Sequence, residues 1–326
     1  MKLARLIVAF IALAATGGAF AQDKVSLRLN WYLGGLHVPF YYGKDKGYYA
    51  AEGIDLTINE GRGSANTVQV VAAGSDTFGL ADSSSVVLTA SKGADVKSVM
   101  SLLNTTGFSV VSLTEAGIKT PKDLEGKKVA VTAGDPLGQL LQAVCKANNV
   151  DCAKINMVQV DPAAKVVTVL EKKTDALLGG ADDQYFLIKY KGGNPVAMRY
   201  ADWGANIVGM TIMTSGDTIK KNPDLVKRFV AATIQAYKET EKNPDAAVAS
   251  MADIVGGSMA EDAGKAQARA VLDVTLGVLY SKANKDKVLG LNVASDWDDM
   301  LALMKNYNDL KTDQPATAFY TNDFLP

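Results

Sequence analysis

The chain has few of the residues from which metal centres and hydrolytic sites are built. Its 326 residues include two cysteines and one histidine. Cys145, Cys152 and His37 cannot complete a closed tetrahedral site, which needs four ligands. One histidine also falls short of the usual catalytic relays, and no Gly-x-Ser-x-Gly elbow stands in a usable context. The sequence therefore predicts no metal, no cofactor and no catalytic residue.

An excess of positive charge is missing as well. The chain has 34 basic and 35 acidic residues. Residues 1–21 contain two of the basic residues, Lys2 and Arg5, and no acidic one, so their removal leaves 32 minus 35, or −3. This balance predicts neither a nucleic-acid partner nor binding to an anionic membrane surface.

The apolar run near the start, residues 6–15, is too short to span a bilayer. Lys2 and Arg5 precede it, and Ala19-Phe20-Ala21 fits a small-residue cleavage site. This pattern is typical of a cleavable secretory signal, so we predict that residues 1–21 are a signal peptide. No cysteine stands directly after the cleavage site, which argues against a lipid anchor.

Both cysteines lie in the part that would be exported. Cys145 and Cys152 are seven residues apart. In an exported chain a local disulfide between them is the natural interpretation.

Aromatic residues and glycines are concentrated between residues 30 and 53. A predicted strand (26–29) leads into this stretch, and the glycines at 34–35 predict a sharp turn. A helix is predicted at 37–46, with a proline in its first turn. A strand end, a glycine turn and a helix start make a ligand-facing corner in open α/β sheets.

Strands and helices alternate along the rest of the chain. Further predicted strands are 54–59, 78–81, 96–103, 108–113, 128–131, 155–160, 176–178, 196–200 and 208–213. Helices are predicted between them, and from residue 214 to 305 the pattern is almost entirely helical. Asn222-Pro223-Asp224 and Asn243-Pro244-Asp245 are typical helix starts, and Leu225, Phe229, Ala232 and Ala236 share one helix face.

Two similar α/β units in sequence predict an α/β fold with two lobes, the first built on a parallel sheet. We expect residues 22–107 and 208–326 to form lobe 1 and residues 108–207 to form lobe 2. The chain then crosses twice between the lobes, and paired crossing strands predict a hinge around a central cleft.

Polar and aromatic residues at the predicted strand ends are the candidate ligand contacts. These are Asn30, Trp31, His37, Tyr41, Arg62, Ser64, Asp82, Ser83, Ser84, Thr105, Asp135, Asp182, Asp183 and Trp203. Trp31 could stack on a flat solute, with core packing as its alternative. Asp82, Asp182 and Asp183 could accept hydrogen bonds from a ring amine.

Other roles stay open for several of these residues. Asp82 and Asp135 each precede a helix and could simply cap it, which is the favoured role of Asp135. His37 could be structural, and Tyr41 could belong to the core. Arg62 suits a carboxylate or sulfonate, or is a solvated loop charge. Trp203 could stack on solute or plug the hinge.

Several motifs of the chain resemble the periplasmic solute-binding proteins of ABC importers. They are Asn30-Trp31, His37 to Tyr41, Lys46-Gly47-Tyr48-Tyr49 with Glu52-Gly53, Gly63-Ser64, Gly74 with Phe78-Gly79-Leu80-Ala81-Asp82, and Leu124-Gly126-Lys127-Val129. The chain is most similar to the branch of thiamine-pyrimidine-precursor binders, near the sulfonate, nitrate and taurine binders. The resemblance implies a two-lobed type II fold, a periplasmic location, and delivery of a small solute to an inner-membrane permease by a monomeric protein.

The solute implied is small and flat: a pyrimidine, a thiamine precursor or another aromatic heterocycle. Alternatives are an alkanesulfonate, nitrate or aromatic carboxylate anion. A pyrimidine-precursor synthase is the enzymatic alternative, since it also resembles this family. That enzyme carries a cysteine-rich motif, which this sequence lacks, so we predict a binding protein.

Overall fold

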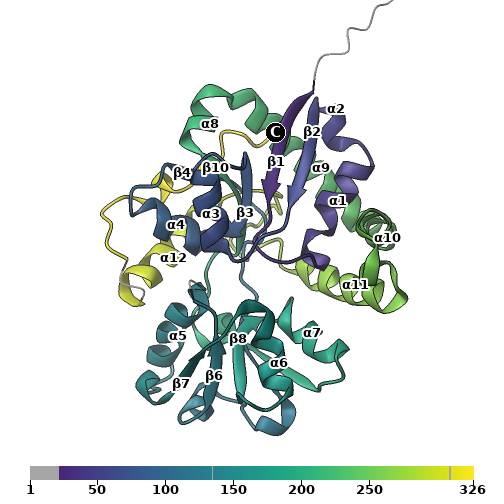
Figure 1. Cartoon of the computed structure of the whole chain (residues 1–326). Helices are drawn as coiled ribbons and strands as arrows, with labels where there is room; N and C mark the ends of the chain where they lie inside the picture. Colours follow the sequence, from purple (N-terminus) through teal and green to yellow (C-terminus); the bar gives the residue numbers. More distant parts are fainter. Residues whose placement is uncertain (1–21, 134, 308–309) are drawn as a thin grey trace, which may run out of the picture.

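The molecule consists of two α/β lobes joined by two crossings of the chain (Figure 1). The computed structural model describes residues 22–133, 135–307 and 310–326. The predicted signal peptide, residues 1–21, lies outside the described residues. Within the described ranges, no helix is both long enough and apolar enough to cross a membrane.

Lobe 1 is built on a five-stranded sheet in the order β2-β1-β3-β10-β4. Its strands are β1 (Asp23–Arg28), β2 (Ile54–Asn59), β3 (Phe78–Asp82), β4 (Val96–Ser101) and β10 (Met210–Ser215). Its helices are α1 (Val38–Asp45), α2 (Tyr48–Ala51), α3 (Ser64–Ala72), α4 (Ser83–Ala90), α8 (Gly216–Lys221), α9 (Pro223–Lys242), α10 (Pro244–Val255), α11 (Asp262–Gly277) and α12 (Ala294–Tyr307).

Lobe 2, drawn in teal, repeats this plan with the sheet order β7-β6-β8-β5-β9. Its strands are β5 (Phe108–Leu113), β6 (Lys128–Val131), β7 (Asn156–Gln159), β8 (Ala176–Gly180) and β9 (Pro195–Arg199). Its helices are α5 (Pro136–Ala147), α6 (Lys165–Leu170) and α7 (Gln184–Tyr190). Short 3-10 helices are η1 (Gly35–His37), η2 (Thr114–Ala116), η3 (Pro121–Leu124), η4 (Cys152–Lys154), η5 (Pro162–Ala164), η6 (Tyr200–Trp203), η7 (Gly257–Ala260) and η8 (Ala316–Ala318).

The α/β fold with two lobes is confirmed, but the expectation of a parallel first sheet is wrong. β1 pairs in parallel with β2 and β3, whereas β10 is antiparallel to both β3 and β4. Met210, where β10 begins, pairs with Asp82, where β3 ends. A chain returning from the other lobe therefore enters at the carboxyl edge of the parallel strands and must run against them. β5 enters the second sheet in the same way, with Phe108 paired to Gly180.

The predicted boundaries at 107/108 and 207/208 fall in the two segments between sheets, residues 102–107 and 204–209. These segments are irregular loops rather than the predicted hinge strands. They still run side by side, because Gly209 N donates to Leu103 O at 2.9 Å. The prediction of an almost continuous helical region to residue 305 is also wrong, since residues 278–293 form no helix.

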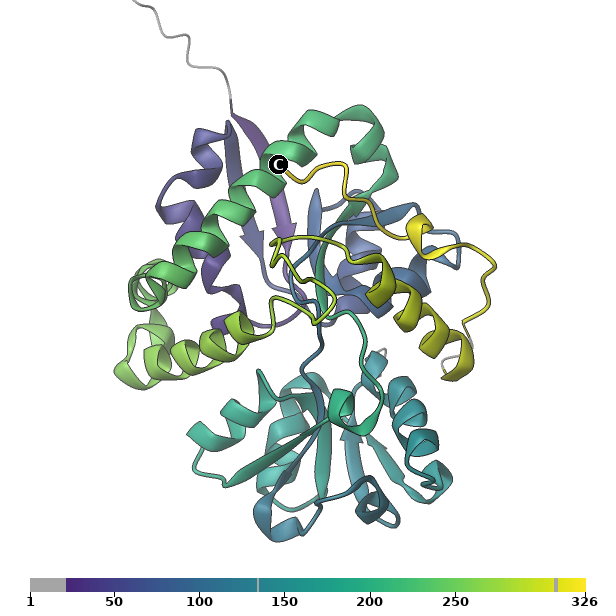
Figure 2. The same cartoon turned by 180° about the vertical axis from the view of Figure 1, so that it is seen from behind.

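Packing in lobe 1 follows the predicted helix face of α9. Phe229, Ala232 and Ala236 are buried and Leu225 is partly buried. The ring of Phe229 stacks on Phe78 of β3, with 3.9 Å between the centroids. Helix α9 thereby covers the sheet, as seen from behind in Figure 2.

Two further contacts join the lobes beyond the crossings. Helix α12, which follows β10 in sequence, packs Trp297, Met300 and Met304 into a cluster that also contains Leu137 and Leu140 of α5. On another side, Tyr190 at the end of α7 donates to the carbonyl of Ala266 in α11 at 3.0 Å. Helices α11 and α12 therefore contact both lobes.

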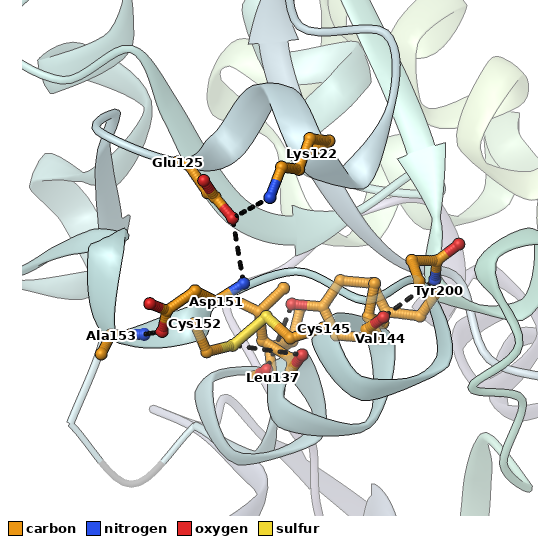
Figure 3. The surroundings of a disulfide bond; sticks show 11 residues. Lys122, Glu125, Leu137, Val144, Cys145, Asp151, Cys152, Ala153 and Tyr200 are labelled. Carbon is orange, nitrogen blue, oxygen red and sulfur yellow. Dashed lines mark hydrogen bonds and ion pairs between the residues drawn. A yellow bond between two sulfur atoms is a disulfide. The ribbon is translucent and has the colours of Figure 1, made fainter.

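The predicted disulfide between Cys145 and Cys152 is present. It links the last turn of α5 to η4 (Figure 3). Glu125 accepts from the Asp151 N–H at 3.0 Å and pairs with Lys122 at 2.6 Å, so η3 is tied to the same turn. The disulfide thus anchors the end of the helix that begins at Asp135.

Removing this disulfide should destabilise the protein. With Cys145 and Cys152 seven positions apart, loop-closure entropy predicts a loss of about 2.5 kcal/mol in the free energy of unfolding. Urea denaturation of Cys145→Ala/Cys152→Ala, beside the wild type with and without reductant, measures it. Reduced wild type serves as the control that keeps both side chains. An unchanged midpoint in both cases would refute the stabilising role.

Candidate functional site

A cavity of about 190 Å³ lies between the lobes, and we call it the interlobe pocket. Its walls come from the loops that follow β1, β2 and β3 in lobe 1 and β6 and β8 in lobe 2. Thr106, Gly107, Gly209 and Met210 of the crossings complete it. A pocket of this size at the carboxyl ends of α/β strands suits a small solute.

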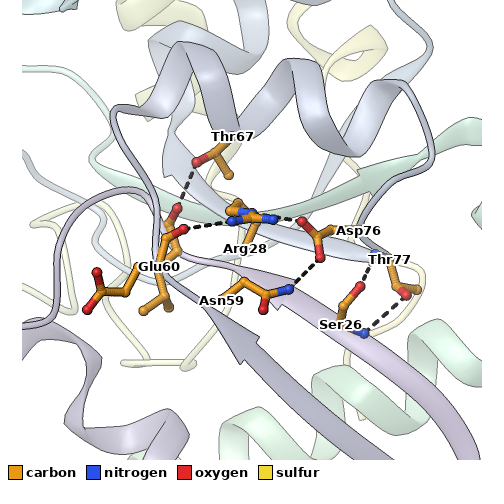
Figure 4. Close-up of polar contacts among 8 residues, drawn as sticks. Ser26, Arg28, Asn59, Glu60, Thr67, Asp76 and Thr77 are labelled. Atoms are coloured by element: carbon orange, nitrogen blue, oxygen red, sulfur yellow. Dashed lines mark hydrogen bonds and ion pairs between the residues drawn. The ribbon is translucent and has the colours of Figure 1, made fainter.

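The end of β1 is held in place by a buried carboxylate (Figure 4). Asp76 accepts from Arg28 Nε at 2.7 Å and from Asn59 Nδ2 at 2.8 Å, which ties the ends of β1 and β2 together. Arg28 also donates to the carbonyl of Glu60 at 2.8 Å. The loop that begins at Asn30 therefore starts from a fixed point.

The loops after β1 and β2 support each other through their backbones. Gly61 N donates to Trp31 O at 3.1 Å, and Gly63 N donates to Asn30 O at 2.8 Å. A Cβ at Gly61 would lie 1.8 Å from Leu29 O, so only glycine permits this approach. By contrast, Gly34 has an ordinary extended φ of −164°. The predicted turn at 34–35 is present as the start of η1, where His37 N donates to Gly34 O at 3.0 Å, and a Cβ at Gly35 would lie 2.1 Å from Ala268 O.

His37 orients Asn30. The backbone N–H of Gly34 donates to His37 Nδ1 at 3.1 Å, and His37 Nε2 lies 3.0 Å from Asn30 Oδ1. Burial lowers the pKa of His37 to about 3, so the ring is neutral. Because Nδ1 accepts, Nε2 carries the proton and donates to Oδ1. This leaves Asn30 Nδ2, which donates to no described residue, as a donor for the interlobe pocket.

Trp31 forms an aromatic wall of the pocket. It is partly buried, and its ring meets Tyr32 edge-on with 5.7 Å between the centroids. Phe108 lines the pocket from the start of β5 in lobe 2. Aromatic rings from both lobes therefore border the space available to a solute.

Asp82, at the end of β3, is 7% exposed and is held by Ser64. Ser64 Oγ donates to Asp82 Oδ2 at 2.8 Å and accepts from the Asp82 N–H at 3.0 Å. Asp82 Oδ1 is buried and has no hydrogen-bond partner in the described ranges. The side chain does not cap α4, although capping was the alternative role. Burial, with Asp135 and Asp182 nearby, raises the pKa of Asp82 to about 7.

Asp135 of lobe 2 is neutralised locally. Lys165 Nζ lies 2.7 Å from Asp135 Oδ2, and the Lys165 residue is 2% exposed. Asp135 also accepts from Leu137 N at 3.4 Å, so it caps α5 as expected. A buried pair of this kind brings little net charge to the pocket.

Asp182 and Asp183 follow β8 and lie on the lobe 2 side of the pocket. Gln184 accepts from Gly180 N at 2.6 Å and donates to Asp183 Oδ2. A Cβ at Gly107 would lie 2.4 Å from Asp182 Oδ1, so the first crossing passes directly beside this carboxylate. Burial and the neighbouring Asp182 raise the pKa of Asp183 to about 7, and burial also raises the pKa of Asp182.

The structure brings nine of the fourteen predicted contacts to the interlobe pocket. They are Asn30, Trp31, His37, Arg62, Ser64, Asp82, Asp135, Asp182 and Asp183. Arg62 is exposed there and forms no ion pair with a described residue.

The other five predicted contacts do not line the pocket. Tyr41 packs with α10 and α11 in a separate apolar cluster. Ser83 donates to Val208 O, and Ser84 is buried in the first turn of α4. Trp203 packs against the apolar cluster beneath α5, and Thr105 lies in the first crossing, where its neighbour Thr106 lines the pocket. The position of a residue at the end of a strand did not predict the direction in which its side chain points.

Sequence reasoning missed several residues that line the pocket: Tyr32, Thr106, Phe108, Lys165 and Gln184. Phe108 and Thr106 had a usable signal, because they stand at the first crossing. Lys165 had only a weak signal: it lies at the start of α6, a few residues after the predicted strand 155–160, and it reaches the pocket through its long side chain.

In the part of the chain that the structure describes, no group of three or more His, Cys, Asp or Glu side chains is placed to hold a metal ion.

The fold is that of the two-lobed periplasmic binding proteins. It superposes on the alkanesulfonate-binding protein SsuA of Xanthomonas axonopodis pv. citri bound to MOPS with a TM-score of 0.71, at 15% identity over 93% of this chain and 99% of that one. For the nitrate-binding protein NrtA of Synechocystis the TM-score is 0.67, at 14% identity over 93% and 87% of the chains. Both structures share the fold of two lobes with this chain.

The chain belongs to the NMT1/THI5-like family, whose model matches residues 35–247. The formylaminopyrimidine-binding protein of Halalkalibacterium halodurans is 24% identical, covering 97% of this chain and 96% of that protein. The riboflavin-binding protein RibY of Chloroflexus aurantiacus is 25% identical over 93% and 86%. A 4-amino-5-hydroxymethyl-2-methylpyrimidine phosphate synthase of Legionella pneumophila is 24% identical over 94% and 93%. The resemblance stated from the motifs is confirmed.

Replacing Asp82 should change how stability depends on pH. Because the folded-state pKa is raised from 3.8 to about 7, the folded protein holds a proton that the unfolded chain has released between these values. Stability therefore falls as pH rises from about 4 to about 7. Asp82→Asn should raise the melting temperature of the ligand-free protein at pH 8 and do so much less at pH 4.5.

The exposed carboxylate of Asp313 offers a matched control, and Asp313→Asn should alter neither value. Melting curves at pH 4.5, 6 and 8 measure all three proteins. An equal effect of Asp82→Asn at every pH would contradict the raised pKa.

Proposed function

We propose that this protein is the solute-binding component of an ABC importer. It captures a small, flat nitrogen heterocycle of the pyrimidine type between its lobes and delivers it unchanged to a permease in the inner membrane. It works as a monomer in the periplasm, after export by the signal at residues 1–21.

The observation that carries the proposal is the pairing of Trp31 with Asn30 at one wall of the pocket. An aromatic face stacks on a flat ring, which contributes about 0.5–1.5 kcal/mol beyond the burial of area. The Asn30 Nδ2 donor, directed by His37, suits a ring nitrogen that accepts a hydrogen bond. Two carboxylates that also line the pocket, Asp82 of lobe 1 and Asp182 of lobe 2, suit an exocyclic amine.

The names of the relatives agree with this solute class. One is a formylaminopyrimidine-binding protein and another a riboflavin-binding protein, and both names denote nitrogen heterocycles. At 24–25% identity these names support a class of ligand rather than one compound.

The synthase names among the relatives make enzymatic pyrimidine synthesis the alternative from another class. Two features weigh against it. His37, the one histidine of the sequence, has both ring nitrogens engaged and is neutral. Both cysteines are joined in a disulfide at the far end of α5. The pocket therefore offers no thiol, and its imidazole is committed to holding Asn30.

A binder of sulfonate, nitrate or carboxylate is the second candidate among carriers. Arg62 favours it, because this guanidinium, which pairs with no carboxylate of the described ranges, lines the pocket and matches planar and tetrahedral anions.

A thermal-shift screen of the mature protein against aminopyrimidines, flavins, aromatic carboxylates, alkanesulfonates and nitrate tests these candidates. We expect aminopyrimidines to raise the melting temperature, because a ligand that binds only the folded state stabilises it. Chromatography of the same mixtures shows whether the solute is recovered unchanged. Steady consumption of a solute would establish the enzyme alternative, and stabilisation by anions alone would establish the anion carrier.

Trp31→Ala should weaken solute binding tenfold or more, because the stacking face is lost. Trp203→Ala is a matched control, since Trp203 lies outside the pocket. Titration calorimetry on both variants, with circular dichroism to verify folding, gives the comparison. Equal affinities of the two variants would remove Trp31 from the solute site.

A further inference from the structure

Carboxylates from opposite lobes meet in the interlobe pocket without enough positive charge to balance them. The charged residues that line it are Asp82, Asp135, Asp182, Asp183, Arg62 and Lys165. Lys165 and Asp135 neutralise each other at 2.7 Å. Three carboxylates then face one remaining cation, and Arg62 is exposed, so water and salt screen its charge.

The lobe 1 carboxylate is incompletely satisfied. Ser64 binds Asp82 Oδ2, whereas Oδ1 is buried without a partner among the described residues. A buried acceptor without a donor is costly, and a buried charge without a counter-charge is more so. The hydrogen bonding of the Asp82 carboxylate is therefore complete only when a donor or a cation enters the pocket.

The lobe 2 carboxylates are arranged to meet the same group. Asp182 lies against Gly107 in the first crossing, and Gln184 holds Asp183 through the Asp183 Oδ2 atom. Burial is the main cause of the raised pKa of Asp82, and the charges of Asp135 and Asp182 of lobe 2 add to it. These carboxylates belong to separate lobes, so their separation depends on how far the cleft is closed.

Closing an empty or anion-filled cleft therefore brings like charges together in a poorly hydrated space. A cationic solute removes this repulsion, and only interactions of the closed state shift the balance between open and closed. An amidine group is well suited, because its paired N–H donors match carboxylate oxygens and its charge is delocalised in a plane.

We propose that Asp82 of lobe 1 and Asp182 and Asp183 of lobe 2 form a carboxylate clamp that selects a solute carrying a positively charged, amidine-type group and rejects anions. The clamp rests on the proposed function, because it names the charge class of the same solute. It assigns stacking to Trp31 and charge selection to the three carboxylates.

Isosteric probes separate charge from shape. Benzamidine, benzamide, benzoate and benzenesulfonate share a flat ring and differ in charge. Cyclohexanecarboxamidine and cyclohexanecarboxylate lack the flat ring. Calorimetry on the mature protein at pH 7.5 should show benzamidine binding at least tenfold more tightly than benzamide, with benzoate and benzenesulfonate weaker still.

Asp82→Asn should reduce benzamidine affinity about tenfold and change benzamide affinity less than twofold. Asp182→Asn and Asp183→Asn test whether the lobe 2 carboxylates contribute to benzamidine affinity. They replace Asp82→Asn as the test if circular dichroism shows that Asp82→Asn does not fold. Asp313→Asn is the matched control and should leave every affinity unchanged.

The outcomes distinguish the clamp from the proposed function. If both amidines bind equally well, the clamp stands and the flat-solute proposal fails. If an anion binds as tightly as its cationic counterpart, or if neither amidine binds, the clamp is overturned. If benzamidine is preferred but the three carboxylate variants match wild type, the clamp is overturned as well, and the charge preference arises elsewhere.

Discussion

One geometric constraint organises the molecule: each crossing enters its new sheet at the carboxyl edge of that sheet's parallel strands. β10 and β5 must therefore run against their neighbours. The same constraint turns the strand-end loops of both lobes toward one another, since those ends lie where the crossings lie. The hinge, the pocket and the polar groups in it then share one region. A rotation about residues 102–107 and 204–209 would change the width of the pocket, because residues of both lobes line it.

Burial decides what the polar groups of that region can do. Near water, Asp82 would be an ordinary carboxylate, and His37 an ordinary titrating imidazole. Inside, His37 is held neutral as a fixed donor to Asn30, and Asp82 keeps an acceptor that has no partner among the described residues. The hydrogen bond between His37 and Asn30 belongs to a satisfied network. The Asp82 oxygen without a described partner costs free energy, and a solute that donates to it can remove that cost. This contrast separates groups that build the site from groups that await a ligand.

The family uses one framework for different chemistry. Relatives of similar identity are named for a formylaminopyrimidine, for riboflavin and for synthesis of a pyrimidine phosphate. In this chain the framework consists of backbone pairing around Gly61 and the Arg28–Asp76 contact, neither of which needs a particular solute. Ligand choice rests on the side chains projecting from it, so fold alone is a poor guide to the solute.

The sequence alone determined the local features: the strands at 54–59 and 108–113, the helix starts at Pro223 and Pro244, the disulfide between Cys145 and Cys152, and the aromatic corner at Trp31. Each depends on residues close in the chain, whose conformational preferences act without the rest of the fold. Long-range packing set the antiparallel entry of β10, the pairing of Ser64 with Asp82, the arrival of Lys165 at the pocket and the position of Trp203 outside it. These depend on contacts between distant segments and on the directions in which side chains leave the backbone, and packing of the whole chain sets both.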